Sequence, residues 1–186
     1  MKQLILNWQM YVNDYDDFLL PIENDAPGLD RRTWVFLLRN YINESQMPDD
    51  YWAEFKQKGI LVCPSFKARE FSQWYPHYGL ADGPSKGGAG GWWFPGVGTL
   101  YGYVKISQVT YPSEKCVFTD SYDSTSGEER GMYWVNPNQA SYVAFRHAGG
   151  RTNVAFVDGH VATLPRDEIY TTYPEWRTSK FWGWGQ

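Results

Sequence analysis

The chain has only two cysteines, no excess of basic residues and no long apolar run. Cys63 and Cys116 are too few for a disulfide framework, and no Cys-x-x-Cys or Cys/His spacing predicts zinc or redox chemistry; the two thiols are either buried separately or joined in one bridge. With 17 Lys and Arg against 21 Asp and Glu, the net charge of −4 excludes the basic surface that nucleic acids require. The apolar runs fall short of the roughly twenty residues that span a bilayer.

Motifs of common catalytic sites are absent as well. There is no Gly-x-Ser-x-Gly, no His-Glu-x-x-His and no phosphate-binding loop. A site built from His147, Asp158 and His160 is excluded, because a regular strand at about 3.3 Å per residue separates the first two by more than about 10 Å. We therefore predict no catalytic residue, no metal site and no enzyme, and we expect structural roles in turns and cross-strand pairs for these motif residues: His147, Asn153, Asp158, Gly159 and His160.

Aromatic residues are abundant instead. They make up 18% of the chain, with 10 Trp and 14 Tyr, so much of the core has to be built from rings that carry a polar group. We expect packing to account for most of them. The glycine-rich segment 79–98 predicts a loop, and its rings Trp92 and Trp93 either fold back on the domain or, with Trp182, form a surface on which a glycan stacks.

The N-terminal segment predicts an amphipathic helix within residues 1–20. Its apolar stripe recurs at three- and four-residue spacing: Leu4, Trp8, Tyr11 and Tyr15. The helical pattern begins at Lys2 with no N-cap residue before it, so we expect this segment to be the C-terminal part of a longer, truncated helix. The helix should fray from Asp16, ahead of Pro21.

After residue 30 the pattern predicts first helices and then strands. Region 30–58 predicts a helical insertion with amphipathic helices over 31–43 and 48–58. Region 60–165 predicts a sheet whose first strands are residues 60–63, 102–107, 115–121 and 132–137. The aromatic tail 166–186 is expected to dock on the domain. With 186 residues, the whole chain, 1–186, predicts a single α+β domain.

The end of the sheet predicts a three-stranded antiparallel meander formed by residues 142–145, 152–157 and 160–164. Asp158-Gly159 is the signal for a two-residue type I′ turn, in which both central residues have positive φ. Such a turn places Val154 opposite Thr163.

An acidic, hydroxyl-rich loop is predicted at residues 120–130, and we expect it to face water. The alternative is a calcium site, because Asp120, Asp123 and Glu128 offer hard oxygen ligands on a flexible connection. Their spacing matches no EF-hand loop. We expect no other cofactor.

Residues 146–161, RHAGGRTNVAFVDGHV, resemble the C-terminal signature of the prepilin-type processing-associated proteins, a group of pilin-like envelope proteins. That signature has a histidine, a nine-residue spacer and Asp-Gly, whereas ten residues separate His147 from Asp158 here. Three further segments resemble the family's N-terminal helix, its Cys-Pro strand and the segment that enters its sheet: 2–21, 60–65 and 104–121.

The resemblance implies a pilin-like fold, with an N-terminal helix on an antiparallel sheet, and a non-enzymatic subunit of a type IV pilus-like or type II secretion-like assembly. Its partners would be other pilin-like subunits or the secretion machinery. The implied location is the bacterial cell envelope or the exterior, with a segment upstream of Met1 that anchors the full-length protein in the inner membrane before assembly. The alternative is a secreted or surface glycan-binding module that uses Trp92, Trp93 and Trp182.

Overall fold

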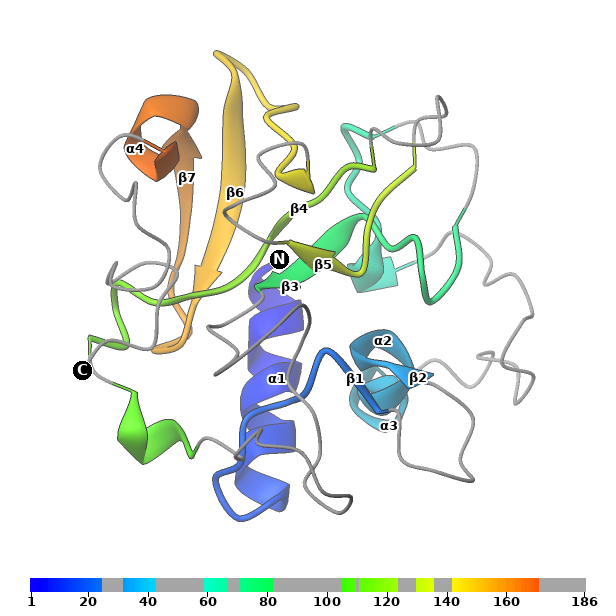
Figure 1. Cartoon of the computed structure of the whole chain (residues 1–186), viewed down its shortest axis with the longest axis vertical. Helices are drawn as coiled ribbons and strands as arrows, with labels where there is room; N and C mark the ends of the chain where they lie inside the picture. The colour runs from blue at the N-terminus through cyan, green and yellow to red at the C-terminus, as the bar shows by residue number, and fades with distance from the viewer. Residues whose placement is uncertain are drawn as a thin grey trace, which may run out of the picture.

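The protein has a mixed α+β architecture built on a five-stranded sheet (Figure 1). This computed structural model describes residues 1–24, 32–42, 59–66, 71–81, 105–109, 111–123, 130–135 and 142–170. The strand order is β5-β3-β4-β6-β7, with β3 and β5 parallel and all other neighbours antiparallel. The strands span β3 (Tyr78–Ala81), β4 (Cys116–Asp120), β5 (Trp134–Val135), β6 (Arg151–Phe156) and β7 (Val161–Pro165). The expectation of a wholly antiparallel sheet is therefore wrong.

The longest helix, α1 (Lys2–Asp14), packs its apolar stripe against the sheet. The predicted stripe is confirmed at Leu4, Trp8 and Tyr11, which are all buried. Tyr15 differs: it lies beyond the helix end, is 50% exposed and stacks on Tyr11. No helix in the described part of the chain has the length and apolar character to cross a membrane.

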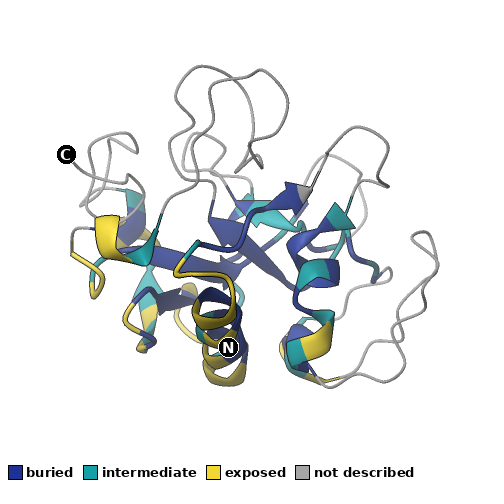
Figure 2. Cartoon of the chain, turned by 90° about the horizontal axis from the view of Figure 1, so that it is seen from below, coloured by how far each residue is buried: buried dark blue, intermediate teal, exposed yellow. Residues whose placement is uncertain are grey.

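Side chains cover both faces of the sheet, as the burial colours in Figure 2 show for the central strands. On one face, Phe118 of β4 and Ala155 of β6 join the cluster that contains the α1 stripe. On the other face, Val154 and Phe156 of β6 pack with Ile169 of α4 (Arg166–Tyr170). Neighbouring residues of a strand point to opposite faces, which explains why β6 supplies both clusters.

The predicted helix over 31–43 is interrupted. Its first residues form β2 (Arg32–Thr33), which pairs with β1 (Glu23–Asn24), and two single-turn helices follow, α2 (Trp34–Leu37) and α3 (Arg39–Ile42). Pairing with β1 holds Arg32 and Thr33 extended, and the break between α2 and α3 lies at Leu38, whose φ of −83° and ψ of −1° depart from helical values. The Trp34 indole N–H donates to the Tyr133 carbonyl, and its ring lies 4.9 Å from that of Phe118. The predicted helix over 48–58 lies outside the described residues.

Parts of two predicted strands, 60–63 and 102–107, are 3-10 turns instead, η1 (Gly59–Leu61) and η2 (Ile106–Gln108), while residues 102–104 lie outside the described residues. β4 lies within the predicted strand 115–121, and β5 begins at Trp134, two residues after the predicted start of the strand 132–137. The sequence placed Gly79 in a loop, but it lies in β3. A Cβ there would be 2.7 Å from Val135 Cγ1, so the missing side chain allows the parallel neighbour β5 to approach.

The hairpin between β6 and β7 is confirmed, but its turn and register differ from the prediction. Asn153, not Val154, lies opposite Thr163. The loop has three residues, because Phe156 N–H donates to the His160 carbonyl and only Gly159 in the loop has positive φ, +89°. A three-residue loop that ends in a left-handed glycine replaces the type I′ turn and shifts the pairing by one residue.

The predicted three-stranded meander is wrong, because β4 occupies the place beside β6. Residues 142–145 form no strand of the sheet and instead pair with the residues at the end of β4. Val143 makes an isolated bridge to Ser121, and Ala144 N–H donates to the Asp120 carbonyl at 2.8 Å.

Candidate functional site

A buried carboxylate marks the end of the central strand β4. Asp120 is 0% exposed and belongs to the same sheet face as Phe118, the face that α1 covers. Its Oδ2 accepts the Asn153 backbone N–H at 2.7 Å and the Thr152 hydroxyl at 3.4 Å. Its Oδ1 makes no hydrogen bond within the described residues. A buried carboxylate oxygen without a partner is uncommon, because its desolvation is not offset.

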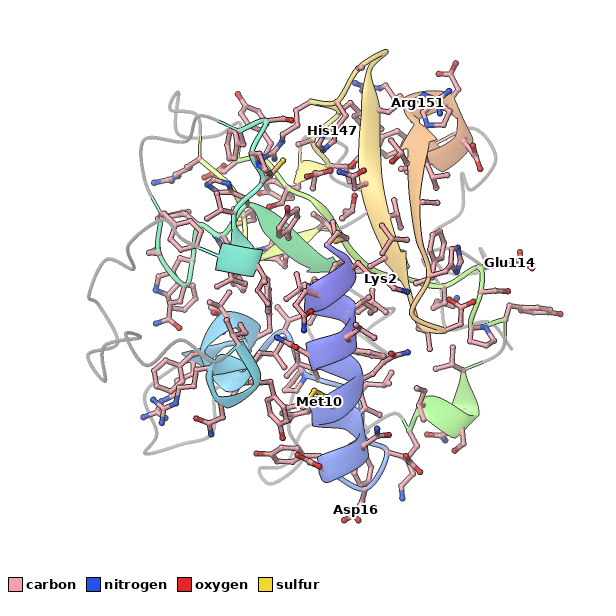
Figure 3. The ribbon with its side chains drawn as sticks, turned by 180° about the vertical axis from the view of Figure 1, so that it is seen from behind. Lys2, Met10, Asp16, Glu114, His147 and Arg151 are labelled. Atoms are coloured by element: carbon pink, nitrogen blue, oxygen red, sulfur yellow. The ribbon has the colours of Figure 1, made fainter. Side chains whose placement is uncertain are left out.

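His147 reaches Asp120 from the turn that leads into β6, as its label beside the start of that strand in Figure 3 indicates. His147 Nε2 lies 3.0 Å from Asp120 Oδ2. The turn is tight, since His147 and Arg151 exchange backbone hydrogen bonds and Gly149 and Gly150 adopt positive φ. The predicted turn-stabilising role of His147 is therefore performed by its backbone, whereas its side chain points to the end of β4.

Cys63 completes the group from a third segment. Its Sγ lies 3.7 Å from His147 Nε2, and Ser65 Oγ lies 3.5 Å from the other ring nitrogen, Nδ1. The Cys63 thiol is buried, and this burial, together with the negative charge of Asp120, raises its pKa. The donor atoms of Cys63, Asp120 and His147 all lie within 4.8 Å of one another.

Asn153 connects this group to the hairpin. Its side-chain Nδ2 lies 2.6 Å from His147 Nε2, and its Oδ1 accepts the Thr163 hydroxyl at 2.8 Å. The observed register makes this possible, because it places Asn153 and Thr163 opposite each other. Asn153, predicted to be structural, thus contacts the histidine directly.

Positive charge also faces the group. The Arg146 guanidinium lies over the Phe66 ring at 3.8 Å, donates to the Ser121 carbonyl and interacts electrostatically with Asp120 and Cys63. Burial lowers the pKa of Arg146, and these two residues act against that shift. Burial likewise lowers the pKa of the Met1 amino group, opposed by the same two residues, so the start of α1 lies near the group.

A neutral histidine lies behind Cys63. His77 is 0% exposed, and its Nδ1 accepts the Cys63 backbone N–H at 2.9 Å. Burial lowers the pKa of His77 to about 4, and the charge of Arg146 acts in the same direction. The ring packs edge-on against Phe66 and Phe71. His77 is therefore an uncharged hydrogen-bond acceptor that positions the Cys63 backbone.

The other motif residues lie at the far end of β6. Asp158 Oδ1 accepts the His160 backbone N–H at 3.0 Å and lies 2.6 Å from His160 Nδ1, while the His160 ring stacks on Phe156. The pKa of Asp158 is lowered, because these bonds from His160 outweigh the effect of burial. His147 and Asp158 do not meet, in accord with the distance argument from the sequence.

The acidic segment after β4 is less solvated than predicted. Asp120, Ser121 and Asp123 are buried. The Asp123 carboxylate accepts a hydrogen bond from Arg130 Nε at 2.9 Å. Glu128 lies outside the described residues, as do Trp92, Trp93 and Trp182, so the calcium and glycan alternatives stay predictions.

Sequence reasoning missed the cluster of Cys63, Asp120 and His147. Cys63 and His147 are 84 positions apart, and Asp120 and His147 are 27 apart, so no local spacing connects them. The available signal was chemical type alone: a Cys, an Asp and a His, each near the end of a predicted strand. Both thiols, Cys63 and Cys116, are free, which settles the open question of a bridge.

A scan against protein-family models found no match, and neither did searches of curated proteins and of solved structures. Function is therefore inferred from the residues and their geometry.

Proposed function

We propose that this protein is a non-enzymatic, pilin-like subunit of a type IV pilus-like or type II secretion-like assembly in the bacterial cell envelope. The observation that carries the proposal is the two-sided character of α1. One face of the helix is buried against the sheet. The opposite face presents Leu6 and Met10, which are 40% and 52% exposed.

The exposed face of α1 is unusual for a surface helix. Among residues 3–13 the exposed side chains are the apolar Leu6 and Met10 and the uncharged polar Gln3 and Asn13. Solvent-facing helix surfaces normally carry charges as well. Leu6 and Met10 are one turn apart and therefore neighbours on the helix surface. Figure 3 shows the N-terminal end of α1, at Lys2, in front of the sheet, with Met10 farther along the helix and Asp16 just beyond its C-terminal end.

Such a face is suited to packing against a second helix. Helices associate when apolar ridges of one fill the grooves of the other, which requires few charges at the contact. A neighbouring subunit that offers an equivalent helix would cover Leu6 and Met10 and exclude water from them. The resemblance of residues 2–21 to the N-terminal helix of pilin-like envelope proteins supports the same arrangement.

Cysteine crosslinking in cells tests this assembly. Met10→Cys is introduced into the gene in its native context, and the cells are treated with a short thiol crosslinker. The matched control is Glu168→Cys, an exposed position on the separate helix α4. The native Cys63 and Cys116 are buried and remain in both variants.

We expect Met10→Cys to give a ladder of crosslinked copies or a product with another pilin-like subunit, and Glu168→Cys to give none. If both variants stay monomeric while the purified protein binds soluble polysaccharide saturably, the assembly function is refuted and the glycan-binding alternative takes its place.

A further inference from the structure

Three chemically distinct metal-binding groups converge at one point of the sheet. Cys63 follows η1, Asp120 ends β4 and His147 precedes β6, and their donor atoms lie within 4.8 Å of one another. A thiolate, an imidazole and a carboxylate are the ligands that zinc sites use. Within the described residues this is the one such group of three.

Two of the three distances between the donor atoms are close to those around a tetrahedral ion, and the third, from Cys63 Sγ to the Asp120 carboxylate, is within 4.8 Å. With Zn–S near 2.3 Å and Zn–N or Zn–O near 2.0 Å, tetrahedral geometry puts a sulfur and a nitrogen ligand about 3.5 Å apart, and a nitrogen and an oxygen ligand about 3.3 Å apart. Cys63 Sγ and His147 Nε2 are 3.7 Å apart, and His147 Nε2 and Asp120 Oδ2 are 3.0 Å apart. Shifts of about 0.3 Å would bring both pairs to the ideal separations.

Hydrogen bonding alone does not satisfy these groups. The Asn153 amide, oriented by Thr163, directs its Nδ2 at His147 Nε2, which requires a lone pair on that nitrogen. Asp120 Oδ2, an acceptor, lies 3.0 Å from the same nitrogen and requires a proton on it. In this orientation of the amide the two requirements conflict, and turning the amide, so that its Oδ1 accepts from His147 and its Nδ2 donates to the Thr163 hydroxyl, removes the conflict. Asp120 Oδ1 is unsatisfied in either orientation, because it is buried and makes no hydrogen bond within the described residues.

A nucleophilic cysteine is the competing interpretation, and the geometry argues against it. In a Cys-His-Asp triad the thiol and the carboxylate bind opposite nitrogens of the imidazole, so that one orients the ring while the other exchanges a proton. Here Cys63 Sγ and Asp120 Oδ2 both face Nε2, and Ser65 faces Nδ1. Convergence of three donor atoms on one point is what a cation requires.

We propose that Cys63, Asp120 and His147 bind one first-row transition-metal ion, with Zn²⁺ the best match to the donor set. The thiol proton of Cys63 is released on binding, and His147 turns its Nε2 lone pair from the Asn153 amide to the ion. The ion joins the segment 59–66, the end of β4 and the turn 147–150. This role is a structural one, independent of any assembly through α1.

One positive group, the Arg146 guanidinium, opposes the ion, since it interacts with Asp120 and Cys63. The thiolate and the carboxylate contribute two negative charges, so these groups together carry a net charge of about +1 with a divalent ion and about +2 with a trivalent one. The lower net charge favours the divalent ion.

Metal titration of the purified, chelator-stripped and reduced protein tests the proposal. Zn²⁺ is followed by calorimetry and by thermal melting, and Co²⁺ by the thiolate-to-metal charge-transfer band, which reports a sulfur ligand directly. The ligand variants are Cys63→Ser, His147→Gln and Asp120→Asn. The matched control is Cys116→Ser, which alters the other buried cysteine.

We expect one equivalent of ion, a higher melting temperature with zinc and a cobalt charge-transfer band in the wild type and in Cys116→Ser. Each ligand variant should lose more than about 100-fold in affinity, beyond the loss typical of second-layer residues. If Asp120→Asn fails to fold, Cys63→Ser decides, and its metal-free melting temperature is measured to establish that this variant is folded. A wild type without the cobalt band, or Cys63→Ser binding zinc as tightly as the wild type, overturns the proposal.

Discussion

Replacing Gly159 by alanine tests whether the tip of the β6–β7 hairpin docks on α1. Lys2 Nζ donates to the Gly159 carbonyl at 2.7 Å, and Gln9 Nε2 donates to the Val157 carbonyl at 3.4 Å. A Cβ on Gly159 would be 2.7 Å from Gln9 Nε2. Alanine therefore both strains the loop, where φ is +89°, and displaces the Gln9 side chain.

Three terms set the expected cost of Gly159→Ala. Positive φ for an L-residue costs about 1–2 kcal/mol, and loss of the Gln9 hydrogen bond costs about 0.5–1 kcal/mol. The alanine also reduces the freedom of the unfolded chain, which returns about 0.4–1 kcal/mol. The net loss of unfolding free energy is expected to be about 1–2 kcal/mol.

Denaturant unfolding of a double-mutant cycle measures the separate terms. In a Gln9→Ala background, Gly159→Ala should cost about 0.5–1 kcal/mol less, because the displaced side chain is already gone. Gly149→Ala is the matched control, since φ there is +74° and nothing lies within 4 Å of the added Cβ. If Gly159→Ala has the same cost in both backgrounds and equals Gly149→Ala, the loop tip does not contact α1 as described.

The remaining predictions concern single side chains and use the same unfolding assay. Asp158→Asn should change stability by less than about 0.5 kcal/mol, because an amide oxygen still accepts the His160 N–H; a loss above about 2 kcal/mol would contradict this. Trp8→Ala should cost about 3–5 kcal/mol of unfolding free energy, and Met10→Ala, at an exposed position, less than about 0.5 kcal/mol. Equal losses would contradict the buried and exposed faces assigned to α1. Burial lowers the pKa of Lys115 to about 8, so the unfolded chain holds that proton more tightly and wild-type stability should rise as the pH increases from about 8 toward 10.5. Lys115→Met should lack that rise and be more stable than the wild type at pH 7 by on the order of 1–3 kcal/mol. If the difference in unfolding free energy between the wild type and the variant is the same at pH 7 and at pH 10, the lowered pKa of Lys115 is refuted.

The sequence alone determined the features that depend on local periodicity. The spacing of Leu4, Trp8 and Tyr11 predicted the buried face of α1, because a helix brings such residues to one side whatever it packs against. The β-branched runs on both sides of Gly159 likewise predicted β6 and β7. Short-range pattern is sufficient where an element is formed by residues close in sequence.

Only the tertiary structure decided which segments meet. The sequence did not show that β4 lies beside β6, or that the loop has three residues and pairs Asn153 with Thr163. Local propensity predicted one helix over 31–43, but its first described residues pair with β1 instead. The approach of Cys63 and Asp120 to His147 has the same origin, since it depends on pairing between distant segments, which no local spacing records.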